Sequence, residues 1–314
     1  MSRSQLQQIT ELLRSSPLDL GGDVTVMRQV FDEMLAATPV PPEVRTTPVT
    51  LGEVPAIEVV AGPDTGPGAI LYFHGGGYAL GSAARSVNLA ADIARRTHRP
   101  VYTVEYRLAP EHPYPAAVDD ADSAYRGLLD DGLPAHAIAV AGESAGGGLA
   151  VALLLRLRDQ GLPLPAATAV MSPWADLTGE ADSLRSRADL DASLTREALA
   201  VRAADYLDGA DPHAPYASPA RADLSGLPPL LVQVGTAEIL LDDALNLAAR
   251  AARDDVSVTL ETFPAAPHVF QGFASVLDEG RDALDRLGAF LRTHLDTPDP
   301  SATAPAAPVP SVTA

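Results

Sequence analysis

The sequence predicts an α/β fold built on a mostly parallel, doubly wound sheet. From Gly68 onward, short apolar segments that favour strands alternate with segments that favour helices. Several of the strand segments are apolar throughout, which is typical of strands that are buried on both faces of a parallel sheet. In sheets of this kind the functional residues lie at the carboxyl ends of the strands.

Eight strands are predicted along the chain. An N-terminal pair, around Val49 and over residues 57–60, precedes the alternating region. The other six are predicted at residues 70–73, 101–106, 138–141, 168–171, 230–234 and 256–263. Helical segments between them, such as 149–157 and 244–253, are expected to flank the sheet.

Two amphipathic helices are predicted before the sheet. One face of the first carries Leu6, Ile9, Leu12 and Leu13. Asp23 is the candidate N-cap of the second. The apolar face of that second helix carries Val24, Met27, Phe31, Met34 and Leu35. Because such faces need a surface to cover, we expect residues 1–44 to dock on the main domain, either as a plain hairpin or as part of a lid.

The main domain is expected to span residues 45–295 with one interruption. Residues 177–220 are polar and rich in Asp and Arg, and Thr195 is the candidate cap of a helix over residues 196–207. We expect this insertion to supply a second piece of a small helical cap. The tail at 296–314 is rich in Pro and Ala without periodicity, and it is expected to be disordered.

A glycine-flanked serine follows the predicted strand at 138–141. Residues 142–146 are Gly-Glu-Ser-Ala-Gly, and a helical segment comes next. Serine at its free pKa is a poor nucleophile, so it must project from a tight turn toward a histidine, and flanking glycines let the strand and helix crowd that turn. Ser144 is therefore the candidate nucleophile. The competing interpretation is an ordinary strand-to-helix turn.

A glycine run disfavours that plainer interpretation. Residues 74–77, which follow the predicted strand at 70–73, are His-Gly-Gly-Gly. Backbone N–H groups there can approach a carbonyl closely enough to stabilise the charge of a tetrahedral intermediate. Gly76, Gly77 and Ala145 are the candidate donors of this oxyanion hole. A phosphate-binding loop fits poorly, because the run lacks a Gly-Lys-Ser/Thr ending.

Three further motifs stand beside these two. They are residues 106–117 (Tyr-Arg-Leu-Ala-Pro-Glu-His-Pro-Tyr-Pro-Ala-Ala), 172–178 (Ser-Pro-Trp-Ala-Asp-Leu-Thr) and 267–270 (Pro-His-Val-Phe). In this order the motifs resemble those of the bacterial hormone-sensitive-lipase-like (family IV) carboxylesterases, which are α/β-hydrolases with a helical cap. The resemblance runs from about residue 45 to 295, with Glu143 where many members carry Asp.

The resemblance also implies the partners of Ser144, in the chain order nucleophile, acid, histidine. Among seven histidines, His268 lies downstream of the acid candidates, in the loop before the last helix, and matches the His-x-Phe site of the family. The family places an acidic residue four positions before a second carboxylate, which puts Glu238 at the catalytic place. Asp242 is the alternative acid, or else a helix N-cap.

Some motif residues have a structural interpretation. His74 matches the glycine motif of the family, and the resemblance implies a structural role for it. The prolines around Arg107 and Glu111 favour a rigid loop that supports the glycine run, rather than a site for substrate charge. For Trp174, the only tryptophan, lining an acyl pocket and packing in the core remain equally open.

Composition excludes several classes of protein. The 314 residues include 22 Lys and Arg against 41 Asp and Glu, a formal net charge of −19, which repels nucleic acid and anionic membranes. Cysteine is absent, which excludes disulfides, thiolate catalysis and cysteine-ligated metals. The N-terminus lacks the apolar core of a secretory signal and no stretch is long enough to span a membrane, so a cytoplasmic location is expected.

The resemblance implies a serine carboxylesterase that hydrolyses short- to medium-chain acyl esters through an acyl-enzyme intermediate, without cofactor or metal. Its expected partner is a small-molecule ester, and homodimerisation is left open. A lactonase or a deacetylase would use the same triad. From a different class, a non-catalytic small-molecule receptor on this fold is the alternative, which an intact Ser144 and His268 disfavour.

Overall fold

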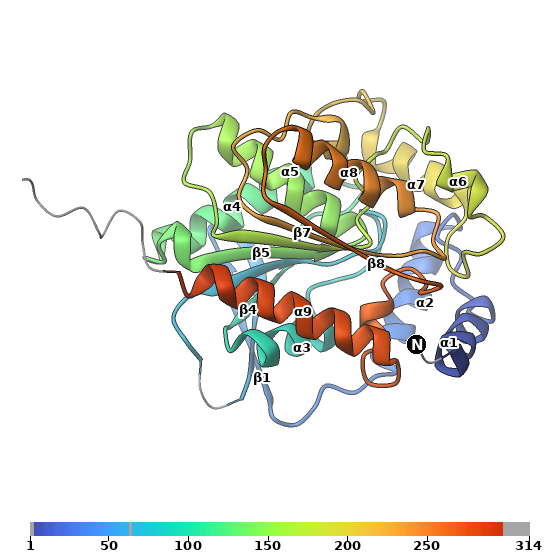
Figure 1. Ribbon diagram of the computed structural model, residues 1–314, viewed down its shortest axis with the longest axis horizontal. Coiled ribbons are helices and arrows are strands. Elements are labelled where there is room, and N and C mark those ends of the chain that lie inside the picture. The colour runs from blue at the N-terminus through green and yellow to red at the C-terminus, as the bar shows by residue number, and fades with distance from the viewer. Residues whose placement is uncertain (1–2, 63–64, 298–314) are drawn as a thin grey trace, which may run out of the picture.

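A single eight-stranded sheet, in the order β1-β2-β4-β3-β5-β6-β7-β8, organises the chain (Figure 1). The computed structural model describes residues 3–62 and 65–297. The strands are β1 (Val44–Leu51), β2 (Val54–Ala61), β3 (Ala69–Phe73), β4 (Val101–Val104), β5 (Ile138–Glu143), β6 (Ala167–Met171), β7 (Leu230–Gly235) and β8 (Val258–Phe263). Strand β2 runs antiparallel to both β1 and β4, and the other neighbours are parallel. The predicted mostly parallel α/β sheet is confirmed.

Helices cover both faces of this sheet. They are α1 (Arg3–Arg14), α2 (Val24–Ala36), α3 (Val87–Thr97), α4 (Ala116–Asp130), α5 (Ala145–Asp159), α6 (Ser183–Ser186), α7 (Arg196–Leu207), α8 (Leu241–Arg253) and α9 (Asp278–Leu295), with short 3-10 turns at Ala135–Ala137, Pro219–Arg221 and Phe270–Phe273. In Figure 1, α3 and α9 lie on one face, whereas α4, α5 and α8 lie on the other.

Strand β3 shows how the two faces are filled. Its side chains alternate, so Ile70 and Tyr72 pack with α3 and α9, while Leu71 and Phe73 pack with α4 and α5. All four side chains are fully buried. Burying a large apolar side chain such as Leu, Ile or Phe contributes about 1.5–3 kcal/mol to stability. A strand that is buried on both faces gains this free energy from the large apolar side chains on both sides. The rigid centre of the sheet thereby fixes the loops at its carboxyl end.

One predicted strand is shorter than its apolar pattern. The predicted segment 101–106 keeps strand geometry only to Val104. Glu105 accepts a hydrogen bond from the Ala83 N–H on its Oε2, and the Tyr106 hydroxyl donates to the carbonyl of His74 at 2.6 Å. These side chains therefore serve the loops at the strand end instead of the sheet ladder.

The N-terminal helices form where the sequence predicts them. The carboxylate of Asp23 accepts hydrogen bonds from Thr25 and Val26 at the start of α2. On α1, Leu6 and Ile9 are buried, but Leu12, expected on the same face, is 58% exposed. The buried part of this face therefore extends for little more than one helical turn. Met34 of α2 is likewise 38% exposed.

The N-terminal segment touches the insertion at 177–220. Arg14 donates to the carbonyl of Asp189, and Arg202 of α7 donates to that of Gly22. Thr195 caps α7 by accepting from Ala198, as its position before the helix predicts. Figure 1 shows α1, α2, α6 and α7 gathered at one end of the molecule.

The predicted disordered tail at 296–314 lies, beyond Thr297, outside the described residues. Asp296 itself follows α9 and forms an ion pair with Arg99. Within the described ranges, no helix has the length and apolarity that crossing a bilayer would demand.

Candidate active site

Ser144 sits in a sharp turn between β5 and α5. Its backbone adopts φ 54° and ψ −123°, a region that L-residues rarely occupy. The turn is possible because Gly146 has no side chain: a Cβ there would lie 2.0 Å from the carbonyl oxygen of Phe73. The strand, the turn and the helix therefore pack in direct backbone contact and present the hydroxyl at the carboxyl end of the sheet.

Two further side chains form a hydrogen-bonded chain with this hydroxyl. His268 Nε2 lies 3.0 Å from Ser144 Oγ. His268 Nδ1 lies 2.6 Å from Glu238 Oε2. The three residues come from the ends of β5, β7 and β8, so folding brings together groups that are up to 124 positions apart. The Ser144 hydroxyl can donate to one ring nitrogen while the other donates to the carboxylate.

Charge around His268 offsets the effect of its burial. The side chain of His268 is 10% exposed and that of Glu238 is fully buried. Burial alone would lower the pKa of His268, but the charge and hydrogen bond of Glu238 outweigh it, and Asp191 and Glu143 add to them, so the pKa is raised above its usual value. The imidazolium that forms on accepting a proton is thereby stabilised.

The second oxygen of Glu238 is also held. Oε1 accepts hydrogen bonds from the Ser172 hydroxyl at 2.8 Å and from the Gly235 N–H at 2.7 Å. The oxygen of Ser172 in turn accepts from the N–H of Val269, next to His268. Ser172 thus connects the acid to the loop that carries the imidazole. Ser172 belongs to the Ser-Pro-Trp motif of the sequence, but only the folded structure shows that it links Glu238 to the loop of His268.

The two carboxylates that follow Glu238 bind elsewhere. Asp242 Oδ2 accepts from the N–H of Ser183, and Asp243 Oδ2 accepts from two N–H groups after β6, those of Ala175 and Asp176. The predicted N-cap role of Asp242 is wrong, because α8 begins one residue earlier, at Leu241, and Asp242 lies in its first turn. The alternative acid therefore anchors the 177–220 insertion instead of contacting His268.

The glycine run forms a loop beside Ser144. Gly76 and Gly77 have φ of 112° and 62°, and a Cβ on Gly76 would lie 2.2 Å from the carbonyl oxygen of Leu80. The N–H of Leu80 closes this turn on the carbonyl of Gly76 at 2.8 Å. Ala145 is the first residue of α5, so its N–H has no acceptor within that helix. The three candidate donors therefore lie on the two backbone segments that meet at Ser144.

Glu143 ties these two segments together. Its Oε1 accepts from the Gly75 N–H at 2.7 Å, and its Oε2 accepts from the hydroxyl of Tyr72. Burial raises the pKa of Glu143 to about 7, against the opposing effect of the hydrogen bonds from Tyr72 and Gly75. The sequence places Glu143 beside the candidate nucleophile, but nothing in the one-dimensional pattern indicates this contact with the glycine run.

The remaining motif residues are built into the scaffold. His74 is buried, stacks on Tyr106 with ring centroids 4.3 Å apart, and has a pKa lowered by burial to about 4. Arg107 pairs with Asp120. Trp174 is 3% exposed in the core, and its backbone N–H donates to the carbonyl of Ser144. This backbone contact holds the segment after β6 against the turn at Ser144, while the indole packs in the core.

Arg28 supports the site from the N-terminal segment, which sequence reasoning missed. Its guanidinium donates to the carbonyls of Ala79 and Ala109 and forms a two-pronged ion pair with Glu111. The arginine lowers the pKa of Glu111 to about 2. Through Arg28, Glu111 is connected to the carbonyl of Ala79, which follows the glycine run. This contact agrees with the structural role that the proline-rich motif predicts for Glu111.

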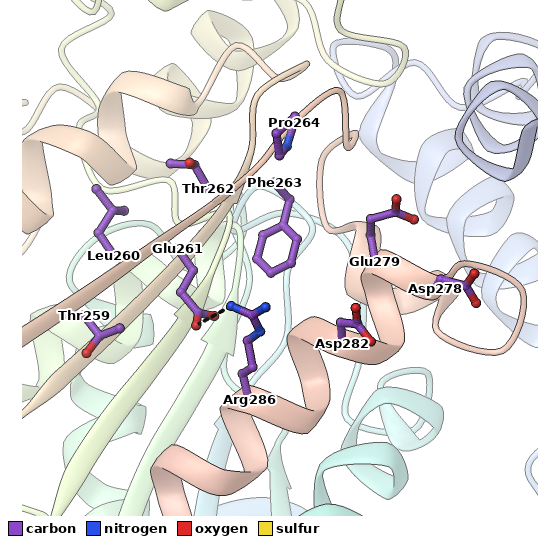
Figure 2. A pocket seen from close by; sticks show the side chains of 10 residues that line it. All are labelled: Thr259, Leu260, Glu261, Thr262, Phe263, Pro264, Asp278, Glu279, Asp282 and Arg286. Carbon is purple, nitrogen blue, oxygen red and sulfur yellow. Dashed lines mark hydrogen bonds and ion pairs between the residues drawn. The ribbon is translucent and has the colours of Figure 1, made fainter. Parts of the chain in front are cut away.

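The groove drawn in Figure 2 lies away from Ser144. It measures about 560 Å³ and runs between β8 and α9. Its polar lining includes Glu261, Asp282 and Arg286, of which Arg286 reaches toward Glu261. None of its lining residues belongs to the hydrogen-bonded chain at Ser144.

Comparison with known proteins places the chain in a family. Residues 70–272 match the family described as alpha/beta hydrolase fold. An acetyl-hydrolase of Streptomyces hygroscopicus is 43% identical over 296 residues, covering 93% of this chain and 98% of its own. An esterase of Acinetobacter venetianus is 38% identical over 282 residues, covering 90% and 92%.

A solved structure agrees with these relatives. The crystal structure of an esterase from the bacterial hormone-sensitive lipase family is 41% identical, with a TM-score of 0.90, and the match covers 93% of this chain and 98% of that one. The fold, the motifs and the relatives agree. The chain belongs to the α/β-hydrolases, within the bacterial hormone-sensitive lipase family of esterases.

Proposed function

We propose that this protein is a serine carboxylesterase that hydrolyses short- to medium-chain acyl esters through an acyl-enzyme intermediate. The observation that carries the proposal is the continuous hydrogen-bonded chain from Ser144 through His268 to Glu238. Relatives named esterase and acetyl-hydrolase at 38–43% identity support the same reaction class.

The first half of the reaction forms the acyl-enzyme. His268 Nε2 takes the proton of Ser144 Oγ while that oxygen attacks the ester carbonyl carbon. The N–H groups of Gly76, Gly77 and Ala145 donate to the oxyanion. These hydrogen bonds are stronger in the transition state, where the oxygen carries negative charge, than in the ground state, where it is a neutral carbonyl oxygen. His268 then gives its proton to the departing alcohol, and the C–O bond of the ester breaks.

The second half regenerates the enzyme. Water loses a proton to His268 Nε2 and attacks the acyl carbon, and the imidazolium returns that proton to Ser144 Oγ as the acid leaves. Throughout, the Glu238 carboxylate accepts from Nδ1, which keeps the imidazole in the productive tautomer and stabilises its charged form.

A p-nitrophenyl ester series from acetate to laurate tests this proposal. We expect turnover to be highest at the short- to medium-chain end, and Ser144→Ala to lower it by about 10³-fold or more. Wild-type turnover that is undetectable on every chain length, or that survives Ser144→Ala, would contradict the proposal. Removal of acetyl groups is the second candidate, favoured by the name of the Streptomyces relative.

The N-terminal segment and the 177–220 insertion together form a cap in this proposal. Support comes from the contacts of Arg14 with Asp189 and of Arg202 with Gly22, which join the two pieces. The N–H of Ile239, in the loop that carries Glu238, donates to Asp191 of the insertion, and Asp242, in the first turn of α8, accepts from the N–H of Ser183. A cap of this kind would form a lid over the acyl pocket.

The cellular setting follows as a further proposal. We propose that the protein binds neither nucleic acid nor anionic membranes, because its net charge of −19 repels both. Co-sedimentation with anionic vesicles and with DNA would test this proposal. We propose a cytoplasmic location, and fractionation of cells that express the protein checks it.

A further inference from the structure

Helix α7 buries two polar side chains over the glycine loop. Arg202 and Tyr206 are 3% and 1% exposed and lie one helical turn apart on the same face. A Cβ on Gly77 would lie 3.1 Å from Cγ of Arg202. The ring of Tyr206 stacks on that of Tyr78, with centroids 3.9 Å apart. These two side chains therefore pack directly on the segment that we propose to hold the oxyanion.

Arg202 uses only part of its guanidinium. Nη2 pairs with Asp205 at 2.8 Å and donates to the carbonyl of Gly22 at 3.3 Å. Its Nε and Nη1 are buried without a hydrogen-bond partner among the residues that the structure describes, and so is the hydroxyl of Tyr206. Guanidinium N–H groups can only donate, so each unpaired nitrogen needs an acceptor.

Arg28 provides the contrast. Arg28 joins the N-terminal segment to the main domain, as Arg202 joins it to the 177–220 insertion, yet each of the three guanidinium nitrogens of Arg28 donates to an acceptor of the protein. Holding the two segments together therefore does not require unpaired donors. Buried donors are costly unless an acceptor meets them, most of all on a charged group. The unpaired nitrogens of Arg202 fit an acceptor that the protein itself does not supply.

We propose that Arg202, with Tyr206 beside it, binds an anionic oxygen group on the substrate, so that the preferred esters are acidic ones. The inference rests on the proposed function and names the substrate class of the same site. A carboxylate or a related oxyanion would accept charge-assisted hydrogen bonds from Arg202, and these are stronger than neutral ones. Because Asp205 engages only Nη2, the Nε and Nη1 donors of Arg202 give an acidic ester a specific place to bind in a chain of net charge −19.

The test compares acidic esters with neutral esters of the same shape. Monomethyl succinate carries its carboxylate in the acyl part, and O-acetylglycolate carries it in the alcohol part. In methyl succinamate and O-acetylglycolamide an amide replaces the carboxylate. For at least one pair we expect kcat/KM to be about 10- to 100-fold higher for the acid. The pair that responds identifies the side of the ester on which the charge is recognised.

Variants on one helix assign the preference. Arg202→Met should bring the acid-to-amide ratio to about one, whereas Arg202→Lys should retain part of it. The control is Arg196→Met, which removes the same charge from an exposed position of α7 and should keep the wild-type ratio. Both kcat/KM values are measured on the same preparation of a variant. A loss of folded protein therefore lowers both values equally and leaves their ratio unchanged. A wild-type ratio near one in both pairs, or a preference that persists in Arg202→Met, would overturn the inference.

A binding measurement separates this inference from the proposed function. On a Ser144→Ala background, calorimetry with the preferred acidic ester should show a Kd at least about 10-fold higher once Arg202→Met is added. An unchanged Kd contradicts the inference. Absence of any ester hydrolysis in wild type contradicts the proposed function instead, whereas hydrolysis of acids and amides at equal rates leaves that function standing and removes the role of Arg202.

Discussion

At the scale of single residues, Glu238 differs from its neighbour Asp242 in what it touches. Glu238 contacts His268 Nδ1, whereas Asp242 contacts the N–H of Ser183. We predict that Glu238→Gln lowers kcat about 10³- to 10⁴-fold, since a triad acid that becomes an amide favours the wrong imidazole tautomer. The measurement is steady-state hydrolysis of a p-nitrophenyl ester, with Asp242→Asn as the matched control.

Asp242→Asn keeps the shape of a side chain that does not touch His268, so its kcat should stay within a few-fold of wild type. If Asp242→Asn abolished turnover while Glu238→Gln kept it, the assignment of the acid would be reversed.

The surroundings of His268 set the acidic limb of the pH profile. Only the neutral imidazole can accept the Ser144 proton, so kcat/KM should rise with pH through the pKa of His268. Because that pKa is raised, the midpoint should lie above about 6.5. Glu238→Gln removes the negative charge that raises it, and the residual activity should show its midpoint at lower pH. A midpoint that stays in place in this variant would mean that another group titrates.

At the scale of elements, the turn from β5 into α5 depends on backbone contact. Gly146→Ala would set a Cβ 2.0 Å from the carbonyl oxygen of Phe73, so that β3 and α5 must separate. We predict a loss of about 2 kcal/mol or more in the free energy of unfolding, together with a large fall in turnover. Gly272→Ala is the control, because a Cβ at Gly272 meets no atom within 4 Å. Equal urea midpoints for the two variants would show that the turn tolerates the added atom.

Helix α2 is held to the main domain by two arginines of different kinds. Arg28 donates to the backbone carbonyls of Ala79 and Ala109, whereas Arg85 forms an exposed ion pair with Asp32 of α2. We predict that Arg28→Met lowers the free energy of unfolding by about 1–3 kcal/mol, because two carbonyls lose a charged donor. Arg85→Met should have a smaller effect, as is usual for exposed ion pairs. Urea denaturation of both variants checks the order, and a reversed order would contradict this account of α2.

At the scale of the whole molecule, periodicity and motif order predict much of the fold and of the candidate site. Strands β3 to β7 are buried and mostly apolar, so their sequence pattern locates them, whereas the edge strands β1 and β8 are largely exposed; all eight lie where predicted, with ends displaced by a few residues. Ser144 could be named from its glycine-flanked turn, whereas the resemblance to a known family implied His268 and Glu238, in the chain order nucleophile, acid, histidine.

Other features could not be predicted, because they arise only when distant segments meet. Nothing local marks Ser172 as the link between Glu238 and the loop of His268, or Glu143 as the acceptor for Gly75. The exposed Leu12 shows the same limit: a helical pattern gives the direction of a side chain, but the extent of the surface beneath it depends on the fold.

A single measurement tests most directly the claim that these side chains converge into a nucleophilic site. The protein is treated with a p-nitrophenyl alkylphosphonate, nitrophenolate release is followed, and the modified peptide is found by mass spectrometry. We predict one nitrophenolate released per chain, a phosphonyl adduct on Ser144, and neither result in Ser144→Ala. An adduct on another residue, or stoichiometric release that persists in Ser144→Ala, would contradict the account.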